Sequence, residues 1–171
     1  MTTTLAGQGQ GQVTMTGIGA LTVTQGTGAL IAQGLGSCIG IAAYDPLRRI
    51  AALAHVMLPG PAPAGLSPDQ LARHAPEAVA ALIDAVERRG GARRLLVVKI
   101  AGGAQVIRLA GRENRFQVGR RNIEAVQAAL AAHGLRVAAE DTGGNTGRTL
   151  TLVAATGAVT VRPAGGAERT L

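Results

Sequence analysis

Two side chains in the first third of the sequence, Cys38 and His55, have the chemistry needed to hydrolyse an amide. Cys38 is the only cysteine of the 171-residue chain and ends the glycine-rich run QGLGSC. A thiol becomes a strong nucleophile when an imidazole takes its proton, and the imidazolium can then protonate the leaving nitrogen. The pair is therefore typical of a cysteine amidohydrolase, which needs no cofactor and no metal.

A β-hairpin is the element that must position this pair. Residues 38–44 and 50–58 are apolar and predict two strands, and the turn residues at 45–48 join them. If the turn is centred between Pro46 and Leu47, the residue numbers of each pair add up to 93. Cys38 then lies opposite His55 on the same face of the hairpin. Directly paired residues have Cβ atoms about 4.5–5.5 Å apart. The spacing predicts a hydrogen bond between thiol and imidazole.

Glycines before the cysteine predict a sharp turn of the backbone at this point. Gly34 and Gly36 allow that turn, and the N–H groups around Ser37 and Cys38 can then converge on one point. Converging N–H groups stabilise the oxyanion of a tetrahedral intermediate. Gly36 and Ser37 are therefore the candidates for backbone support of the reaction.

The same residue types also have plain structural explanations. A cysteine in an apolar strand commonly packs in the core, and a histidine at a strand end is commonly structural. His74, in a loop, and His133, at a predicted helix C-terminus, fit a structural role. Asp141 is a candidate third member of a triad, but an aspartate beside Thr-Gly is typical of a turn.

Composition favours a sheet-rich fold of one domain. The chain is 47% apolar but only 1% aromatic and has 25 glycines, which indicates close packing of small side chains. The pattern predicts about six or seven strands and two helices, at about 76–89 and 121–133. We expect an α+β fold with mixed or antiparallel sheets. The domain spans 14–163, between a flexible leader at 1–13 and a loose tail at 164–171.

Several classes of protein are disfavoured. No segment reaches the roughly 18 apolar residues of a membrane helix, so no membrane insertion is expected. A single cysteine excludes an internal disulfide and suits a cytoplasmic protein. The formal charge of +7 comes almost entirely from arginines that are scattered along the sequence, and no nucleic-acid motif accompanies them.

Five ordered stretches resemble the CheD family, the chemoreceptor glutamine deamidases of bacterial chemotaxis. They are GLGSCIGIAAYDP at 34–46, ALAHVMLP at 52–59, KIAGGA at 99–104, VGRRNIEAV at 118–126 and EDTGGNTGR at 140–148. The resemblance implies that Cys38 is the nucleophile and His55 the general base. It implies that the substrate is a glutamine side chain of a chemoreceptor cytoplasmic domain, which becomes glutamate. It further implies that the α+β fold is a layered sandwich of mixed or antiparallel sheets with two main outer helices. A CheC-type phosphatase is the partner that the resemblance implies.

One position departs from the family pattern. Members usually carry a threonine six residues before the cysteine, as a third catalytic residue, and Ala32 stands there in this chain. An alanine cannot form a hydrogen bond with the imidazole. Either a backbone carbonyl, a water or another side chain orients His55, or activity is reduced. Reduced activity is the basis of an alternative function, a catalytically weakened homologue that acts mainly as a binding module for a CheC-type phosphatase.

Overall fold

Two mixed β-sheets form most of the computed structural model, which describes residues 11–105 and 117–171. The first sheet has, in spatial order, β1 (Val13–Met15), β3 (Ala29–Leu35), β8 (Arg148–Val153), β9 (Val159–Pro163) and β10 (Arg169–Thr170). The second has β2 (Leu21–Gln25), β5 (Ile50–Val56), β4 (Ile39–Asp45), β6 (Val97–Gly102) and β7 (Val137–Thr142). Only β1–β3 and β6–β7 pair in parallel among the strands described.

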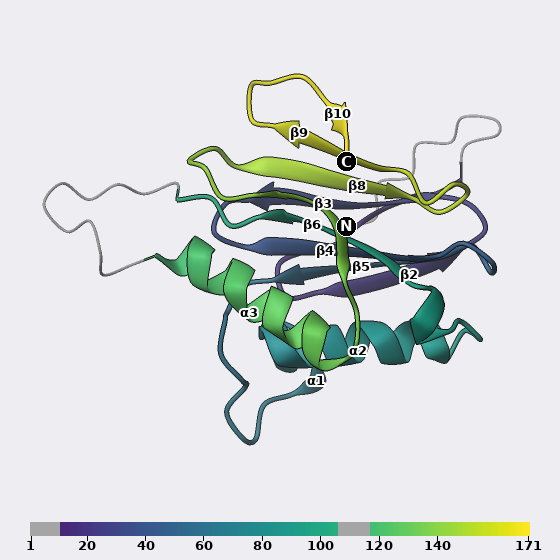
Figure 1. Ribbon diagram of the computed structural model, residues 1–171, viewed down its shortest axis with the longest axis horizontal. Helices are drawn as coiled ribbons and strands as arrows, with labels where there is room; N and C mark the ends of the chain where they lie inside the picture. Colours follow the sequence, from purple (N-terminus) through teal and green to yellow (C-terminus); the bar gives the residue numbers. More distant parts are fainter. Residues whose placement is uncertain (1–10, 106–116) are drawn as a thin grey trace, which may run out of the picture.

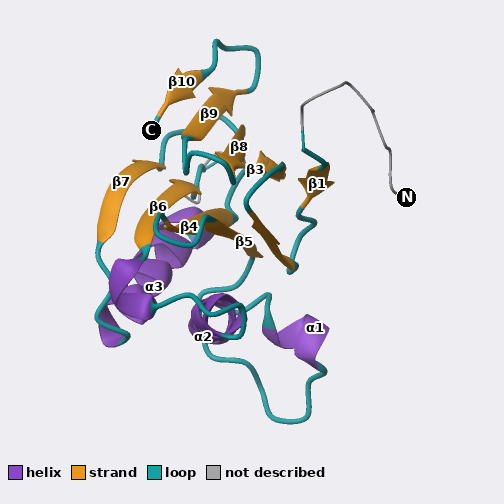
Figure 2. Ribbon diagram, turned by 90° about the vertical axis from the view of Figure 1, so that its right-hand side faces the viewer, coloured by secondary structure: helices purple, strands orange, loops and turns teal. Residues whose placement is uncertain are grey.

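The sheets face one another, and helices cover the outer face of the second sheet (Figure 1, Figure 2). The helices are α1 (Pro68–Leu71), α2 (Ala75–Glu87), α3 (Val118–Ala132) and the short 3-10 helix η1 (Arg93–Leu95). One apolar core fills the space between the sheets, and a second lies between the second sheet and helices α2 and α3. The expected α+β sandwich with two main outer helices is confirmed.

The helices begin and end close to where their apolar spacing predicts. Val79, Leu82 and Val86 of α2 recur at helical spacing and are fully buried in the core beneath the second sheet. The corresponding stripe of α3 comprises Gly119, Asn122, Val126 and Leu130. None of the helices in the described ranges is long and apolar enough to cross a membrane.

The central hairpin β4–β5 is buried along its whole length. Its residues alternate between the two cores: Ile39 and Ile41 face the helices, whereas Ala42 and Tyr44 face the first sheet. Strands covered on both faces read as continuous apolar runs, as these do. The many alanines let the layers approach closely, which is how a chain nearly devoid of aromatic residues fills its interior.

Both ends of the described chain differ from the sequence-based expectation. The C-terminal residues 164–171 are not a loose tail, because they turn back and form β10, in which Arg169 pairs with Val161. Leu171 then packs against the core between the sheets. At the other end, Val13 already belongs to β1, while residues 1–10 of the expected leader lie outside the described residues.

Candidate active site

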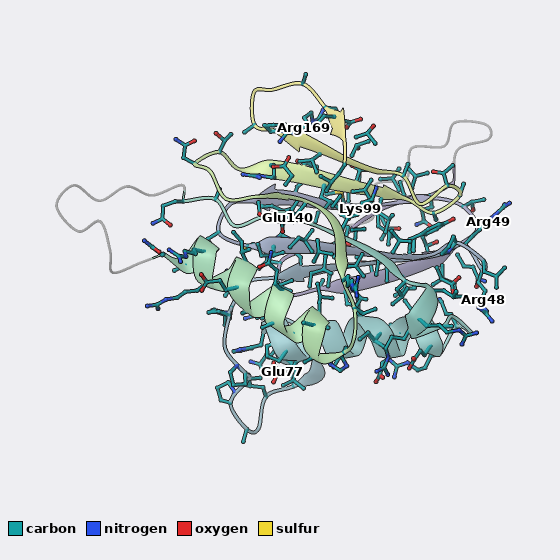
Figure 3. All side chains as sticks on the ribbon, viewed as in Figure 1. Arg48, Arg49, Glu77, Lys99, Glu140 and Arg169 are labelled. Atoms are coloured by element: carbon teal, nitrogen blue, oxygen red, sulfur yellow. The ribbon has the colours of Figure 1, made fainter. Side chains whose placement is uncertain are left out.

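The register of the β4–β5 hairpin differs by two residues from the predicted one. Asp45 pairs with Ile50 and Gly40 pairs with His55, so Cys38 is not directly opposite His55. The turn has four residues, as predicted, but it spans 46–49 and is centred one residue later than expected. The Asp45 carboxylate accepts the N–H groups of Leu47 and Arg48 within it, at 3.0 and 3.1 Å. Arg49 closes the turn with a left-handed φ of 52°. Figure 3 shows Arg48 and Arg49 at the right-hand edge of the molecule, where this turn projects.

A shift of two residues keeps every side chain on its predicted face. Cys38, which directly precedes β4, lies in the core between the sheets together with Leu53 of β5. His55 follows Leu53 by two positions and therefore projects from the same face. Cys38 and His55 thus occupy diagonal positions on one surface. Diagonal neighbours are about 7–8 Å apart in a regular sheet, and their Cβ atoms are somewhat closer.

His55 is held through one of its two ring nitrogens. Nδ1 lies 3.3 Å from the backbone oxygen of Thr16, just after β1, and the side chain is buried. A carbonyl oxygen only accepts hydrogen bonds, so Nδ1 carries the proton and Nε2 carries the lone pair. Nε2 is buried and makes no hydrogen bond within the described part of the chain. The ring is therefore fixed in the tautomer of a general base.

Burial keeps both groups neutral in the resting protein. It lowers the pKa of the His55 imidazole, and the bond to Thr16 opposes this shift only in part. It also raises the pKa of the Cys38 thiol, which is 8% exposed. The predicted thiol–imidazole hydrogen bond is absent from the described residues, since Nε2 has no partner there. Burial thus disfavours both a lone thiolate and a lone imidazolium.

The backbone on either side of Cys38 is clamped by the glycine-rich segment after β6. Gly103 donates its N–H to the Cys38 oxygen at 2.9 Å, and Ala104 donates to the Gly36 oxygen at 2.7 Å. A Cβ on Gly102 would lie 2.1 Å from the Cys38 oxygen, so this close approach requires glycine. The N–H of Gly36 is bonded to Gly34, so Gly36 supports the turn through its carbonyl.

Two N–H groups remain beside the thiol. Neither Ser37 nor Cys38 donates its backbone N–H to another group in the described ranges. Such donors next to a nucleophile can stabilise an oxyanion. The sequence-based expectation for Ser37 therefore stands as a candidate role.

A buried asparagine joins the segments that carry the two groups. Nδ2 of Asn122, on α3, donates to the backbone oxygens of Ser37 and Met57, at 2.8 and 3.0 Å. Asn122 is fully buried, and its Oδ1 makes no hydrogen bond in the described structure. Sequence reasoning did not single it out. The available signal was a polar residue on the apolar stripe of α3, between Gly119 and Val126.

A family model described as CheD chemotactic sensory transduction matches residues 57–163. The chain belongs to the CheD family. A probable CheD of Symbiobacterium thermophilum is 47% identical over 149 residues, covering 83% of this chain and 86% of the relative. A probable CheD of Archaeoglobus fulgidus is 39% identical over 158 residues, covering 92% and 98%. CheD of Thermotoga maritima is 37% identical over 153 residues, covering 90% and 93%. All three relatives are named chemoreceptor glutamine deamidases.

The position of the CheD threonine, Ala32, lies on β3 opposite Leu150. Its methyl group is fully buried in the core between the sheets. Of the groups that could orient His55 in its place, the structure has a backbone carbonyl, that of Thr16. Thr16 is itself fixed by its N–H bond to Ile31 and its hydroxyl bond to Thr22.

The remaining sequence candidates serve the scaffold of this CheD fold. His74 is the N-cap residue of α2, and its Nδ1 lies 2.9 Å from the backbone oxygen of Gly60. His133 is the C-cap residue of α3. Asp141 forms ion pairs with Arg148 and Arg169. Arg148 in turn donates to backbone oxygens of the loop at 141–146. Asp141 is thus committed to this loop, and its carboxylate forms no hydrogen bond with His55.

A cavity of about 300 Å³ opens beside that loop. It is lined by Asp141 to Thr146, Arg148, Pro163 and Arg169, and it contains neither Cys38 nor His55. Within the described residues, no group of three or more histidine, cysteine or acidic side chains could hold a metal ion. The cavity is therefore separate from the candidate catalytic pair.

Proposed function

We propose that this protein is a chemoreceptor glutamine deamidase, a cysteine-dependent protein-glutamine glutaminase that converts selected receptor glutamines to glutamates. Its relatives carry that name. The observation that carries the mechanism is the state of His55, whose Nδ1 is held by Thr16 while its buried Nε2 is unbonded. Nε2 projects from the face that also holds the only thiol of the chain.

The first step forms a bond between Cys38 and the substrate. Nε2 of His55 takes the proton of the thiol while Sγ attacks the side-chain carbonyl carbon of a glutamine. The carbonyl oxygen becomes an oxyanion, which in this proposal accepts hydrogen bonds from the unbonded N–H groups of Ser37 and Cys38. Because burial disfavours both a lone thiolate and a lone imidazolium, the proton transfer and the attack are coupled.

The second step releases ammonia, and the third releases glutamate. The imidazolium gives its proton to the amide nitrogen, the C–N bond breaks, and a thioester remains on Cys38. Nε2 then takes a proton from a water molecule, whose oxygen attacks the thioester carbon. Collapse of this intermediate breaks the C–S bond and returns the proton to sulfur, which regenerates the thiol.

The substrate glutamines belong to receptor cytoplasmic domains, so we place the protein in the cytoplasm, as a single catalytic domain that runs from β1 to β10. A CheC-type phosphatase is the regulatory partner that the family resemblance implies. The alternative function, a weakened homologue that serves as a binding module for that phosphatase, rests on Ala32. The Thr16 carbonyl argues against it, because it supplies the orienting hydrogen bond that alanine lacks.

The test uses a purified receptor cytoplasmic fragment and the full-length protein. Each deamidated glutamine adds about 1 Da to its peptide and releases one ammonia. We expect both signals with the parent protein and neither with Cys38→Ala. The substitution removes only the buried sulfur atom, so the unfolding free energy should change by about 1 kcal/mol or less. Full activity in a folded Cys38→Ala protein would refute the mechanism, and an inactive parent would favour the binding module.

A further inference from the structure

Asn122 connects three parts of the chain that are far apart in sequence. It lies 85 residues from Ser37 and 65 residues from Met57, yet its single amide nitrogen donates to both backbone oxygens. Ser37 immediately precedes the nucleophile, and Met57 lies two residues after the base. One side chain on α3 therefore fixes the ends of the two segments that carry the catalytic pair.

The bond to Ser37 also determines where an N–H group points. The peptide between Ser37 and Cys38 is planar and trans, since the described chain has no cis peptide bond. In a trans peptide the carbonyl oxygen and the N–H point in opposite directions. By holding the Ser37 oxygen towards α3, Asn122 turns the Cys38 N–H away from α3. That N–H is one of the two unbonded donors beside the thiol.

The residue type argues for a role beyond packing. Asn122 is fully buried, and its Oδ1 has no hydrogen-bond partner among the described residues. An unbonded buried oxygen lowers stability, so packing alone favours an apolar residue here. Val126 and Leu130 occupy the next inward positions of the same stripe and are apolar. What asparagine adds is its pair of amide hydrogens, which bind the two carbonyls.

We propose that Asn122 is a positioning residue of the deamidase, which aims the Cys38 N–H at the oxyanion and sets the spacing between Cys38 and His55. The inference rests on the proposed function. Asn122 touches neither substrate nor reacting atoms and acts through the Ser37 and Met57 carbonyls. Its loss should therefore slow the chemical step and leave substrate binding unchanged.

Asn122→Ala removes both donated bonds, and Asn122→Asp removes the N–H donors while nearly preserving volume. The matched control is Val126→Ala, because Val126 is also fully buried on α3 but packs only in the apolar core. kcat and KM are measured on the receptor fragment for the parent and all three variants, each normalised to its folded fraction. Removing one oxyanion donor typically costs about 10²–10³ in kcat.

We expect both Asn122 variants to have kcat at least about tenfold below that of Val126→Ala, with KM within about threefold of the parent. Equal kcat for the Asn122 variants and the control overturns the inference while the proposed function stands, because the parent is active in the same assay. A rise in KM alone also overturns it. Failure of both Asn122 variants to fold overturns it as well, because Asn122 then serves the fold. An inactive parent removes the proposed function and the inference together.

Discussion

The imidazole of His55 is bound to the backbone oxygen of Thr16, 39 residues earlier in the chain, at 3.3 Å. This bond joins β5 of one sheet to the segment that follows β1 of the other. It places the proton on Nδ1 and leaves the lone pair on Nε2. Because the acceptor belongs to the backbone, this hydrogen bond does not itself require a particular side chain on the accepting residue.

His55→Gln tests the role of Nε2 directly. Glutamine is polar and similar in length, but it has no basic nitrogen. We expect kcat on a receptor fragment to fall by about 10²–10⁴, the usual contribution of a general base. The same change at the helix end, His133→Gln, should leave kcat within about twofold of the parent. A His55→Gln protein with unaltered kcat would mean that another group moves the protons.

The dependence of stability on pH follows from two buried neutral groups. Burial lowers the pKa of His55 below its ordinary value of 6.5, so on acidification the unfolded chain takes up the proton first. The unfolding free energy should therefore decrease as pH falls below that value. Burial raises the pKa of Cys38 above its ordinary value of 9.0, so on alkalinisation the unfolded chain loses the proton first. Stability should also decrease as pH rises above that value.

Urea unfolding of matched variants separates the two contributions. The difference in unfolding free energy between His55→Gln and the parent should shift in favour of the variant between about pH 7.5 and 5.5. The difference for Cys38→Ala should shift in favour of the variant between about pH 8 and 10. Differences that are independent of pH in both ranges would show that these groups ionise as freely in the folded chain as in the unfolded one.

The position of the catalytic pair could be predicted from the sequence only in part. The alternation of side chains along the two strands predicts that Cys38 and His55 project from the same face. A register shift of two residues preserves this face. The register itself depends on where the turn is centred, which is one residue later than predicted. Local contacts of Asp45 and the left-handed backbone of Arg49 determine this position. The predicted direct pairing of Cys38 with His55 was wrong for this reason.

Two supporting contacts differ in how visible they are in the sequence. Every residue has a carbonyl, so nothing marks Thr16 as the partner of His55. Asn122 is more accessible to sequence reasoning, because helical spacing places it on an apolar stripe. Its partners are again carbonyls, on segments 85 and 65 residues away, and only the packing of α3 on the sheet identifies them. The individual strands and helices, by contrast, follow from patterns within single elements.

Asp45 should be the residue on which the hairpin register depends most. Its carboxylate is fully buried and accepts the N–H groups of Leu47, Arg48 and Ala92. Burial by itself raises the pKa of this carboxyl, but the three N–H groups and the Arg48 charge together hold it below its ordinary value. We therefore expect Asp45→Ala to reduce the unfolding free energy at pH 7 by about 2–5 kcal/mol in urea titrations. Asp84→Ala, an exposed change on α2, should stay within about 0.5 kcal/mol of the parent.

Ala32→Thr restores the hydroxyl that CheD proteins usually carry at this position. From sequence alone, the missing hydroxyl predicts that the change raises kcat. The Thr16 carbonyl already fixes the imidazole tautomer, so we expect kcat to stay within about threefold of the parent. Ala32 is fully buried between the sheets, and a larger polar side chain there should lower the unfolding free energy by about 1–3 kcal/mol.

Ala29→Thr, on the same strand and only partly buried, is the control for strand propensity and should have little effect on either quantity. A rise of tenfold or more in kcat for Ala32→Thr, with KM unchanged, would show that the Thr16 bond orients His55 poorly. The hydroxyl would then be the stronger orienting group, and this chain would be a deamidase slowed by its alanine. A flat kcat together with reduced stability would show that the backbone carbonyl has taken over the orienting role, so that alanine at this position costs no activity.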